Sequence, residues 1–325
     1  MQGSTYTQKP DLVLIDNVTV TVDELTWLSP KIVREFMKES FQPAGHLGKT
    51  MDMKAYLMFV EQPWRRFMLG LSIANNDLCF HFYDHTGSAI SPPFNIHEHP
   101  NHLIYILSAL AFGYHSCLSF NPSIRISPPP VACCSKLCFL ACLMTMSSCS
   151  PPNPFSSLSS RLSSPSICTV DGSQHTLMIG TIQVGDMIYD LIDILFSSPS
   201  FLGRGTICYL TCHNGCYYVI KDSWVWVPTG MLDQTLTDLS QNPALNEVRI
   251  MQHLSHIDGV PRLHGWWFVQ VDKEDDTTQR YREEKWQKKI KVQRVHLCRV
   301  MTPYARPLTE FKSKKELVSC VRDIL

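Results

Sequence analysis

The stretch of residues 202–221 constrains the fold of this chain more than any other. It reads LGRGTICYLTCHNGCYYVIK. Residues 207–210 and 216–220 are rich in β-branched and aromatic side chains, which predicts two strands. Asn214-Gly215 lies between these runs, and this dipeptide is the strongest short signal for a two-residue hairpin turn. We therefore expect a glycine turn followed by two antiparallel strands.

Gly203 and Gly205 form the glycine turn that opens this stretch. Glycine lets a backbone approach phosphate oxygens closely and adopt angles that a side chain would forbid. The pattern departs from G-x-G-x-x-G, because the third glycine would fall at Cys208. A lone G-x-G is typical of a plain turn as well as of a phosphate-binding turn. Both interpretations are open at this point.

A helix is expected after the hairpin. Asn242-Pro243 places a helix-capping residue before a proline at the first helical position. Apolar residues then recur at helical spacing, at Leu245, Val248, Met251 and Leu254. This stripe predicts that one face of the helix packs on the sheet.

Lys221 and Glu247 are the charged residues that these elements would bring together. Lys221 closes the apolar run of the second strand, and Glu247 lies beside the apolar stripe of the helix. A lysine held by a glutamate in this way orients nucleotide phosphates in phosphotransferases. The alternative is that Glu247 is a solvated carboxylate on an ordinary amphipathic helix.

Seven segments, in order, resemble the fungal-type protein kinase family. In the C-terminal part they are GRGT (203–206), VIKDSW (219–224), HIDGVPRL (256–263) and PLTEFKSKKEL (307–317). In the N-terminal part, KPDLVLID (9–16), WRRFMLGLSI (64–73) and FYDHTGSAISPPFNIH (82–97) are similar to the segment that precedes the kinase lobe in that family. The resemblance covers most of the chain apart from a central insert. It implies an ATP-dependent phosphotransferase of the serine/threonine type that uses Mg²⁺.

The resemblance also implies roles for individual residues. Gly203 and Gly205 would cover the nucleotide phosphates, Lys221 would orient them, and Glu247 would hold Lys221 in place. After a last small-lobe strand at residues 295–300, the adenine-binding hinge would lie at residues 301–305, with Met301, Pro303 and Tyr304 at the nucleotide. Residues 316–325 would begin the first long helix of the large lobe.

The sequence contains neither H-R-D-x-x-x-x-N nor D-F-G, the motifs that supply the catalytic aspartate and the metal ligands of a kinase. Val321-Arg322-Asp323 is no substitute, because the family places this helix before the catalytic loop. We therefore expect a truncated kinase-like chain that binds nucleotide poorly and transfers no phosphate by itself. The alternative is a non-catalytic module of pseudokinase type that binds nucleotide or a partner protein.

Composition predicts an intracellular protein, cytoplasmic or nuclear. Among 325 residues, Lys+Arg 29 balance Asp+Glu 29, which gives no support for a nucleic-acid or anionic-membrane partner. The first residues lack the charged start and the apolar run of a signal peptide. The 13 cysteines of such a chain are expected to be reduced thiols.

Residues 121–170 differ from the rest of the chain, being rich in Ser, Pro and Cys. We expect a disordered insert. Its apolar run, residues 131–146, is short for a membrane span and contains Lys136. Cys134, Cys138 and Cys142 lack the paired C-x-x-C spacing of structural zinc sites. The insert is therefore predicted to have neither a membrane nor a metal role.

Two weaker candidates lie in the N-terminal part. Asp11, Glu35 and Lys38 resemble the PD-(D/E)xK nuclease constellation, in which carboxylates hold a divalent cation. The E-x-x-K spacing is one residue too long for a strand, so a degenerate remnant is expected.

The second candidate is a histidine cluster, His97, His99 and His102. Pro100 would break the helix that an H-E-x-x-H zinc site requires, so polar loop histidines are expected.

The sequence thus predicts an α+β protein. A mixed α/β domain would span residues 1–120, the insert residues 121–170, and a kinase-like small lobe, an antiparallel sheet with one helix, residues 171–325. Residues 272–291, where many acidic and basic residues lie close together, are predicted to form a solvated loop or an exposed helix.

Overall fold

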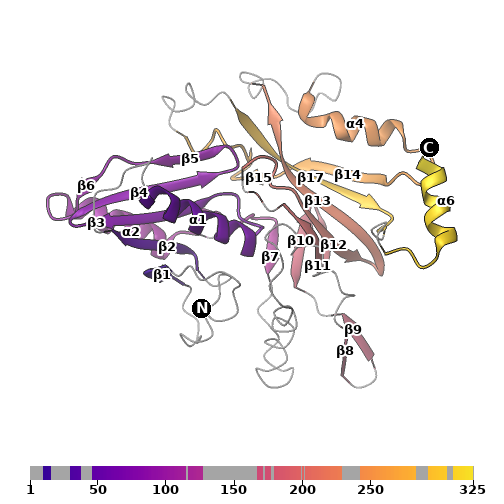
Figure 1. Cartoon of the computed structure of the whole chain (residues 1–325), viewed down its shortest axis with the longest axis horizontal. Coiled ribbons are helices and arrows are strands. Elements are labelled where there is room, and N and C mark those ends of the chain that lie inside the picture. The colour runs from indigo at the N-terminus through magenta and orange to yellow at the C-terminus, as the bar shows by residue number, and fades with distance from the viewer. Residues whose placement is uncertain are drawn as a thin grey trace.

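The computed structural model describes residues 10–15, 30–37, 46–114, 116–126, 167–170, 173–176, 179–198, 200, 202–228, 242–282, 292–305 and 310–324. Two sheets lie next to each other along the long axis of the molecule (Figure 1). Helices accompany both, and nearly all strand pairs are antiparallel. The α+β class is confirmed.

The N-terminal sheet has six strands in the order β1-β2-β3-β4-β5, with β6 paired to β4. The β2–β3 pair is parallel and the others are antiparallel. The strands are β1 Leu12–Leu14, β2 Ile32–Met37, β3 Met68–Ala74, β4 Asp77–Asp84, β5 Gly87–Ile90 and β6 Phe94–Asn95. Strand β3 is buried along its whole length, which requires cover on both faces.

Helices α1 (His46–Glu61) and α2 (Pro100–Phe112) supply that cover. On one face Met51 and Met58 of α1 pack with Val33 and Tyr83 of the sheet. On the other face Leu110 of α2 belongs to a second apolar cluster with strand residues of β3 and β4. The N-terminal part is therefore a layered α/β unit built around β3.

The C-terminal sheet has seven strands in the order β14-β17-β13-β12-β11-β10-β7, all paired antiparallel. The strands are β7 Ile124–Ile126, β10 Gly180–Val184, β11 Met187–Ser197, β12 Ile207–His213, β13 Cys216–Val227, β14 Arg262–Phe268 and β17 Gln293–Thr302. Small two-stranded ladders join β8 (Ile167–Val170) to β9 (Ser173–Thr176) and β15 (Gln270–Val271) to β16 (Glu274–Asp275). Strand β7 lies in the predicted insert but forms the edge of this sheet.

The predicted Asn214-Gly215 hairpin joins β12 to β13. Both residues have positive φ angles, 51° and 76°, as a two-residue turn of type I′ requires. The prediction that Lys221 closes the second strand is wrong, because β13 continues to Val227. The polar residues after Lys221 looked like a strand end, yet Asp222 and Ser223 are buried and find partners inside the molecule.

The predicted capped helix is also present. The side chain of Asn242 accepts a hydrogen bond of 2.9 Å from the backbone N–H of Ala244, and a 3-10 turn (Pro243–Leu245) leads into α4 (Asn246–His253). Leu245 and Val248 are buried against strand residues such as Val295. The last helix, α6 (Lys314–Ile324), exposes apolar side chains at Val318 and Val321. No helix in the described ranges has both the length and the apolar character needed to cross a membrane.

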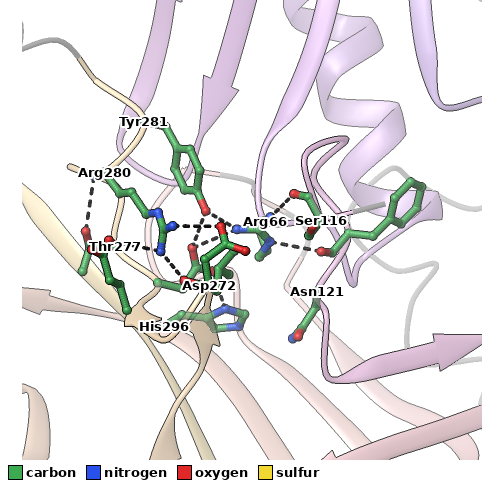
Figure 2. A network of polar contacts seen from close by, with 12 residues as sticks. Arg66, Ser116, Asn121, Asp272, Thr277, Arg280, Tyr281 and His296 are labelled. Atoms are coloured by element: carbon green, nitrogen blue, oxygen red, sulfur yellow. Dashed lines mark hydrogen bonds and ion pairs between the residues drawn. The ribbon is translucent and has the colours of Figure 1, made fainter. Parts of the chain in front are cut away.

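A buried polar network joins the two sheets (Figure 2). Arg66, next to β3, places Nη1 3.0 Å from Oδ1 of Asp276 and donates from Nε to the carbonyl of Phe120. Oδ2 of Asp276 lies 3.0 Å from Nδ1 of His296 on β17. The other ring nitrogen of His296 lies 2.5 Å from Oδ1 of Asp222 on β13. We call Arg66, Asp276, His296 and Asp222 the junction network.

The prediction of a solvated segment at residues 272–291 is wrong for Asp276 and Arg282, whereas Asp272, Lys273 and Glu274 are exposed as expected. Asp276 is fully buried, and Arg282 is buried in an ion pair of 2.6 Å with Asp84 of the N-terminal sheet. Asp276 and Arg282 can be buried because oppositely charged residues far away in the sequence neutralise them. Arg66 pairs with Asp276, and Asp84 pairs with Arg282. Residues 283–291 lie outside the described ranges.

The carboxylates around His296 decide its charge. Burial by itself lowers the pKa of His296, but Asp222 and Asp276 outweigh burial and raise this pKa to about 9. Burial alone raises the pKa of Asp276, yet the hydrogen bond from His296 and the charge of Arg66 lower it overall. At neutral pH the network therefore consists of two cations and two carboxylates.

We predict that Asp276→Ala strongly destabilises the protein, because Arg66 and His296 would stay buried with one counter-charge fewer. The expected loss in the free energy of unfolding is about 3–5 kcal/mol, measured by urea denaturation. Asp272→Ala is the matched control, since the Asp272 side chain is 79% exposed beside Arg280. Its loss should stay under about 1 kcal/mol. Equal losses in the two variants would contradict a stabilising role for the network.

We also predict that stability falls as the pH rises from 6.5 to 10. The pKa of His296 is raised in the folded state, so its contribution is fully present below pH 6.5 and is lost as the pH passes about 9. The expected change is on the order of 3 kcal/mol, followed by urea denaturation at each pH. In His296→Gln this pH dependence should flatten, whereas His97→Gln, at an exposed position of the N-terminal unit, should retain it. An unchanged slope in His296→Gln would refute the assignment.

Candidate functional site

The C-terminal sheet has two different faces because side chains alternate along each strand. Lys221 and Arg299 are directly opposite each other on β13 and β17 and point towards α4. Asp222 and His296 belong to the other face, which meets the N-terminal sheet through the junction network. The predicted site residues Lys221 and Glu247 therefore lie on the face that the N-terminal sheet leaves uncovered.

The predicted contact between Lys221 and Glu247 is present. Nζ of Lys221 lies 2.5 Å from Oε1 of Glu247, and the two side chains are 20% and 34% exposed. Glu247 sits in the first turn of α4, where the helix dipole favours a negative charge. The ammonium of Lys221 is thus fixed in direction but still accessible to a ligand.

Arg299 is a residue of this site that the sequence analysis missed. Its side chain is fully buried, with Nη1 2.5 Å from Oε2 of Glu247 and Nη2 donating to Oγ of Ser223 at 2.5 Å. Burial alone raises the pKa of Glu247, but Lys221 and Arg299 together lower it. Only the β13–β17 register, which sets Arg299 opposite Lys221, reveals this second cation.

The two glycines of the turn differ in what surrounds them. Gly203 has a φ of +106°, and a side chain added there would meet nothing within 4 Å. Gly205 has a φ of +45°, and an added Cβ would come within 2.2 Å of the His85 ring. Between them, the carbonyl of Arg204 accepts a hydrogen bond of 2.7 Å from the N–H of Trp224. Gly203 thus borders open space, whereas Gly205 is packed against the N-terminal sheet.

Met301, the first of the predicted hinge residues, lies on the same face of the sheet as Lys221. Met301 lies directly opposite Val219 at the end of β17, two positions after Arg299. Pro303 and Tyr304 come after the strand and are exposed. Val219 comes two residues before Lys221 on β13. Val219 and Met301 therefore form an apolar surface beside the ammonium group of Lys221.

The weaker nuclease candidate forms an ion pair instead. Glu35 lies on β2 and pairs at 2.8 Å with Lys54 of α1, both side chains being buried. Asp11 accepts a hydrogen bond of 2.8 Å from the N–H of Phe36 and donates its own N–H to Glu35. Lys38 lies outside the described ranges. Glu35 is thus neutralised by Lys54, a lysine that the local spacing could not indicate.

The histidine cluster was only partly predicted. Pro100 begins α2 instead of breaking a helix, because the first helical position needs no N–H donor. His102 is therefore helical and its ring stacks on that of His99 at 5.3 Å, while His97 is exposed in the preceding turn.

Potential metal ligands come together at one place in the described part of the chain, at Asp222, His296 and Cys298. Both ring nitrogens of His296 are already bonded to carboxylates, so this group is an ion network and not a metal centre. The described cysteines are free thiols, at positions 79, 117, 208, 212, 216, 298 and 320. Cys134, Cys138 and Cys142 lie outside the described ranges.

Comparison with known protein families decides the family of the chain. A family model described as fungal protein kinase matches residues 9–325. The chain belongs to the fungal protein kinase family. The match includes the N-terminal sheet as well as the C-terminal sheet. No curated protein and no solved structure matches the chain.

We predict that Glu247→Ala destabilises this fungal protein kinase family member more than Lys221→Ala does. Removing Glu247 leaves the buried Arg299 without its counter-charge, for an expected loss of about 3 kcal/mol. Removing Lys221 leaves Glu247 paired with Arg299 and should cost about 1 kcal/mol or less. Urea denaturation measures both, and Glu98→Ala, at an exposed position before α2, is the control for loss of an exposed carboxylate. Equal losses for Glu247→Ala and Lys221→Ala would contradict the role given to Arg299.

Proposed function

We propose that the Lys221 face of the C-terminal sheet binds ATP and that this sheet, with α4, is the small lobe of a serine/threonine-type protein kinase. The observation that carries the proposal is the ion pair between Lys221 and Glu247. It joins a strand lysine to a glutamate of the next helix, after a glycine turn, which is the order of these parts in kinases.

The residues around the pair suit a nucleotide. The partly exposed ammonium of Lys221 offers a cation to the phosphates, and open space borders the backbone of Gly203. Gly205, packed on the N-terminal sheet, would act by shaping the turn. Val219 and Met301 present apolar surface for adenine, with Pro303 and Tyr304 next along the chain as the hinge. ATP is therefore the cofactor that this site fits.

Magnesium fits this face less well. In the described ranges, the one group of potential metal ligands lies on the opposite face of the sheet. The sequence also lacks the H-R-D and D-F-G motifs that hold the metal and accept the substrate proton. Mg²⁺ would arrive bound to the ATP phosphates, and we assign no residue of this chain to phosphoryl transfer itself.

Arg299 favours a second candidate function, a nucleotide- or partner-binding module of pseudokinase type. Because Glu247 is already held by a buried arginine, α4 stays attached to the sheet without a nucleotide. Such a lobe can present a fixed surface to a partner protein whether or not ATP is bound.

We predict that Mg·ATP stabilises the protein and that Lys221→Ala removes this effect. At an ATP concentration 100 times the Kd, the gain is about 2.7 kcal/mol, seen as a rise in Tm. Lys315→Ala, at an exposed position of α6, is the matched control and should respond like the unchanged protein. Magnesium without nucleotide should give no shift. Absence of any shift at millimolar ATP would refute nucleotide binding and leave the partner-binding module.

A further inference from the structure

His85 connects the N-terminal sheet to the glycine turn. It lies in the turn between β4 and β5, and its side chain is buried. Its ring sits between Phe59 of α1, at a centroid distance of 5.3 Å, and Trp224 of β13, at 5.2 Å. The ring therefore fills the space between one helix of the N-terminal unit and the C-terminal sheet.

His85 touches both glycines of the turn. Its carbonyl accepts a hydrogen bond of 3.0 Å from the N–H of Gly203. Its ring occupies the place where a side chain of residue 205 would lie, 2.2 Å from an added Cβ. Position 205 must therefore be glycine for packing on His85 and not only for approach to a ligand.

The turn that carries His85 is itself held on both sides. Oδ1 of Asp84 accepts hydrogen bonds from the N–H groups of Thr86 and Gly87, at 2.7 and 3.1 Å. Arg282, from the C-terminal unit, pairs with the same carboxylate at 2.6 Å. On the other side, the Trp224 ring stacks on His296 of the junction network at 4.5 Å. The turn that carries His85 is thus held by contacts from both units.

We infer that His85 is a positioning residue for the nucleotide site, through which the N-terminal sheet fixes the glycine turn. This inference rests on the proposed ATP binding. With Gly203 bonded to His85 and Gly205 packed on its ring, the turn is ordered before a ligand arrives. Because the turn is already ordered, ATP binding does not carry the entropic cost of ordering it. The N-terminal sheet therefore raises the affinity for ATP without contacting the nucleotide.

A double-mutant cycle tests the contact itself, independently of nucleotide. The variants are His85→Ala, Gly205→Ala and the two combined, with stability measured by urea denaturation. Gly205→Ala alone forces a methyl group into the His85 ring, and His85→Ala removes that ring. The double variant should therefore lose clearly less stability than the sum of the single losses. Additive losses would overturn the contact, whether or not the protein binds ATP.

Hydrogen–deuterium exchange tests the ordering of the turn. In His85→Ala, exchange should accelerate about tenfold or more in peptides covering residues 202–206, while peptides of α4 keep their rates. His97→Ala, at an exposed position of the same unit, is the matched control and should leave residues 202–206 unchanged. If His85→Ala proves too unstable to purify, Gly205→Ala replaces it with the same expectation. Unchanged exchange at residues 202–206 would overturn the inference.

ATP affinity completes the test. His85→Ala should bind Mg·ATP about tenfold more weakly than the unchanged protein, whereas Lys221→Ala should lose binding altogether. If the unchanged protein binds no ATP, the proposed function fails while the cycle and the exchange data still decide the contact. If it binds and His85→Ala binds equally well despite faster exchange, the positioning role is wrong and the proposed function stands.

Discussion

The charge on His296 is the interaction on which the two-sheet structure depends. A protonated imidazole between Asp222 and Asp276 lets two carboxylates be buried, and Asp276 in turn neutralises Arg66. Without that cation, two carboxylates would face a single arginine in a site closed to water, which destabilises the folded protein. The junction network therefore requires the sheets to form together, because each contributes charges that the other must compensate.

The junction network uses only one of the two faces of the C-terminal sheet. One face is used for attachment, through Asp222, Trp224 and His296. The other carries Lys221, Arg299 and the α4 contact, and stays available to a ligand. Because side chains alternate along β13, neighbouring residues Lys221 and Asp222 serve the two tasks without interfering. The polar run after Lys221 is explained by this division and not by a strand end.

Several parts of the fold and of the candidate site were predictable because they depend on local chemistry. The Asn214-Gly215 turn needs two positive φ angles, and the Asn242-Pro243 cap needs a side-chain acceptor and a missing N–H. The apolar stripe of α4 follows from helical spacing alone. The approach of Glu247 to Lys221 then follows, since a helix packed by that stripe brings its first turn to β13. Arg65 and Arg66 show what local sequence cannot predict. Their adjacent positions do not indicate that both side chains are fully buried with different partners.

The sequence by itself determined the hairpin, the capped helix, the α+β class and, through its motifs, the resemblance to fungal protein kinases. Only the tertiary structure decided that Asp276 and Arg282 are buried, that Arg299 shares Glu247 with Lys221, and that Gly205 packs on His85. The physical reason is the range of the interactions. Turns, caps and helical stripes depend on neighbours within a few residues, whereas a buried charge or a ring contact depends on partners far along the chain. His296 and Arg66 both contact Asp276 although they are far apart in the sequence, so no local pattern predicts these contacts.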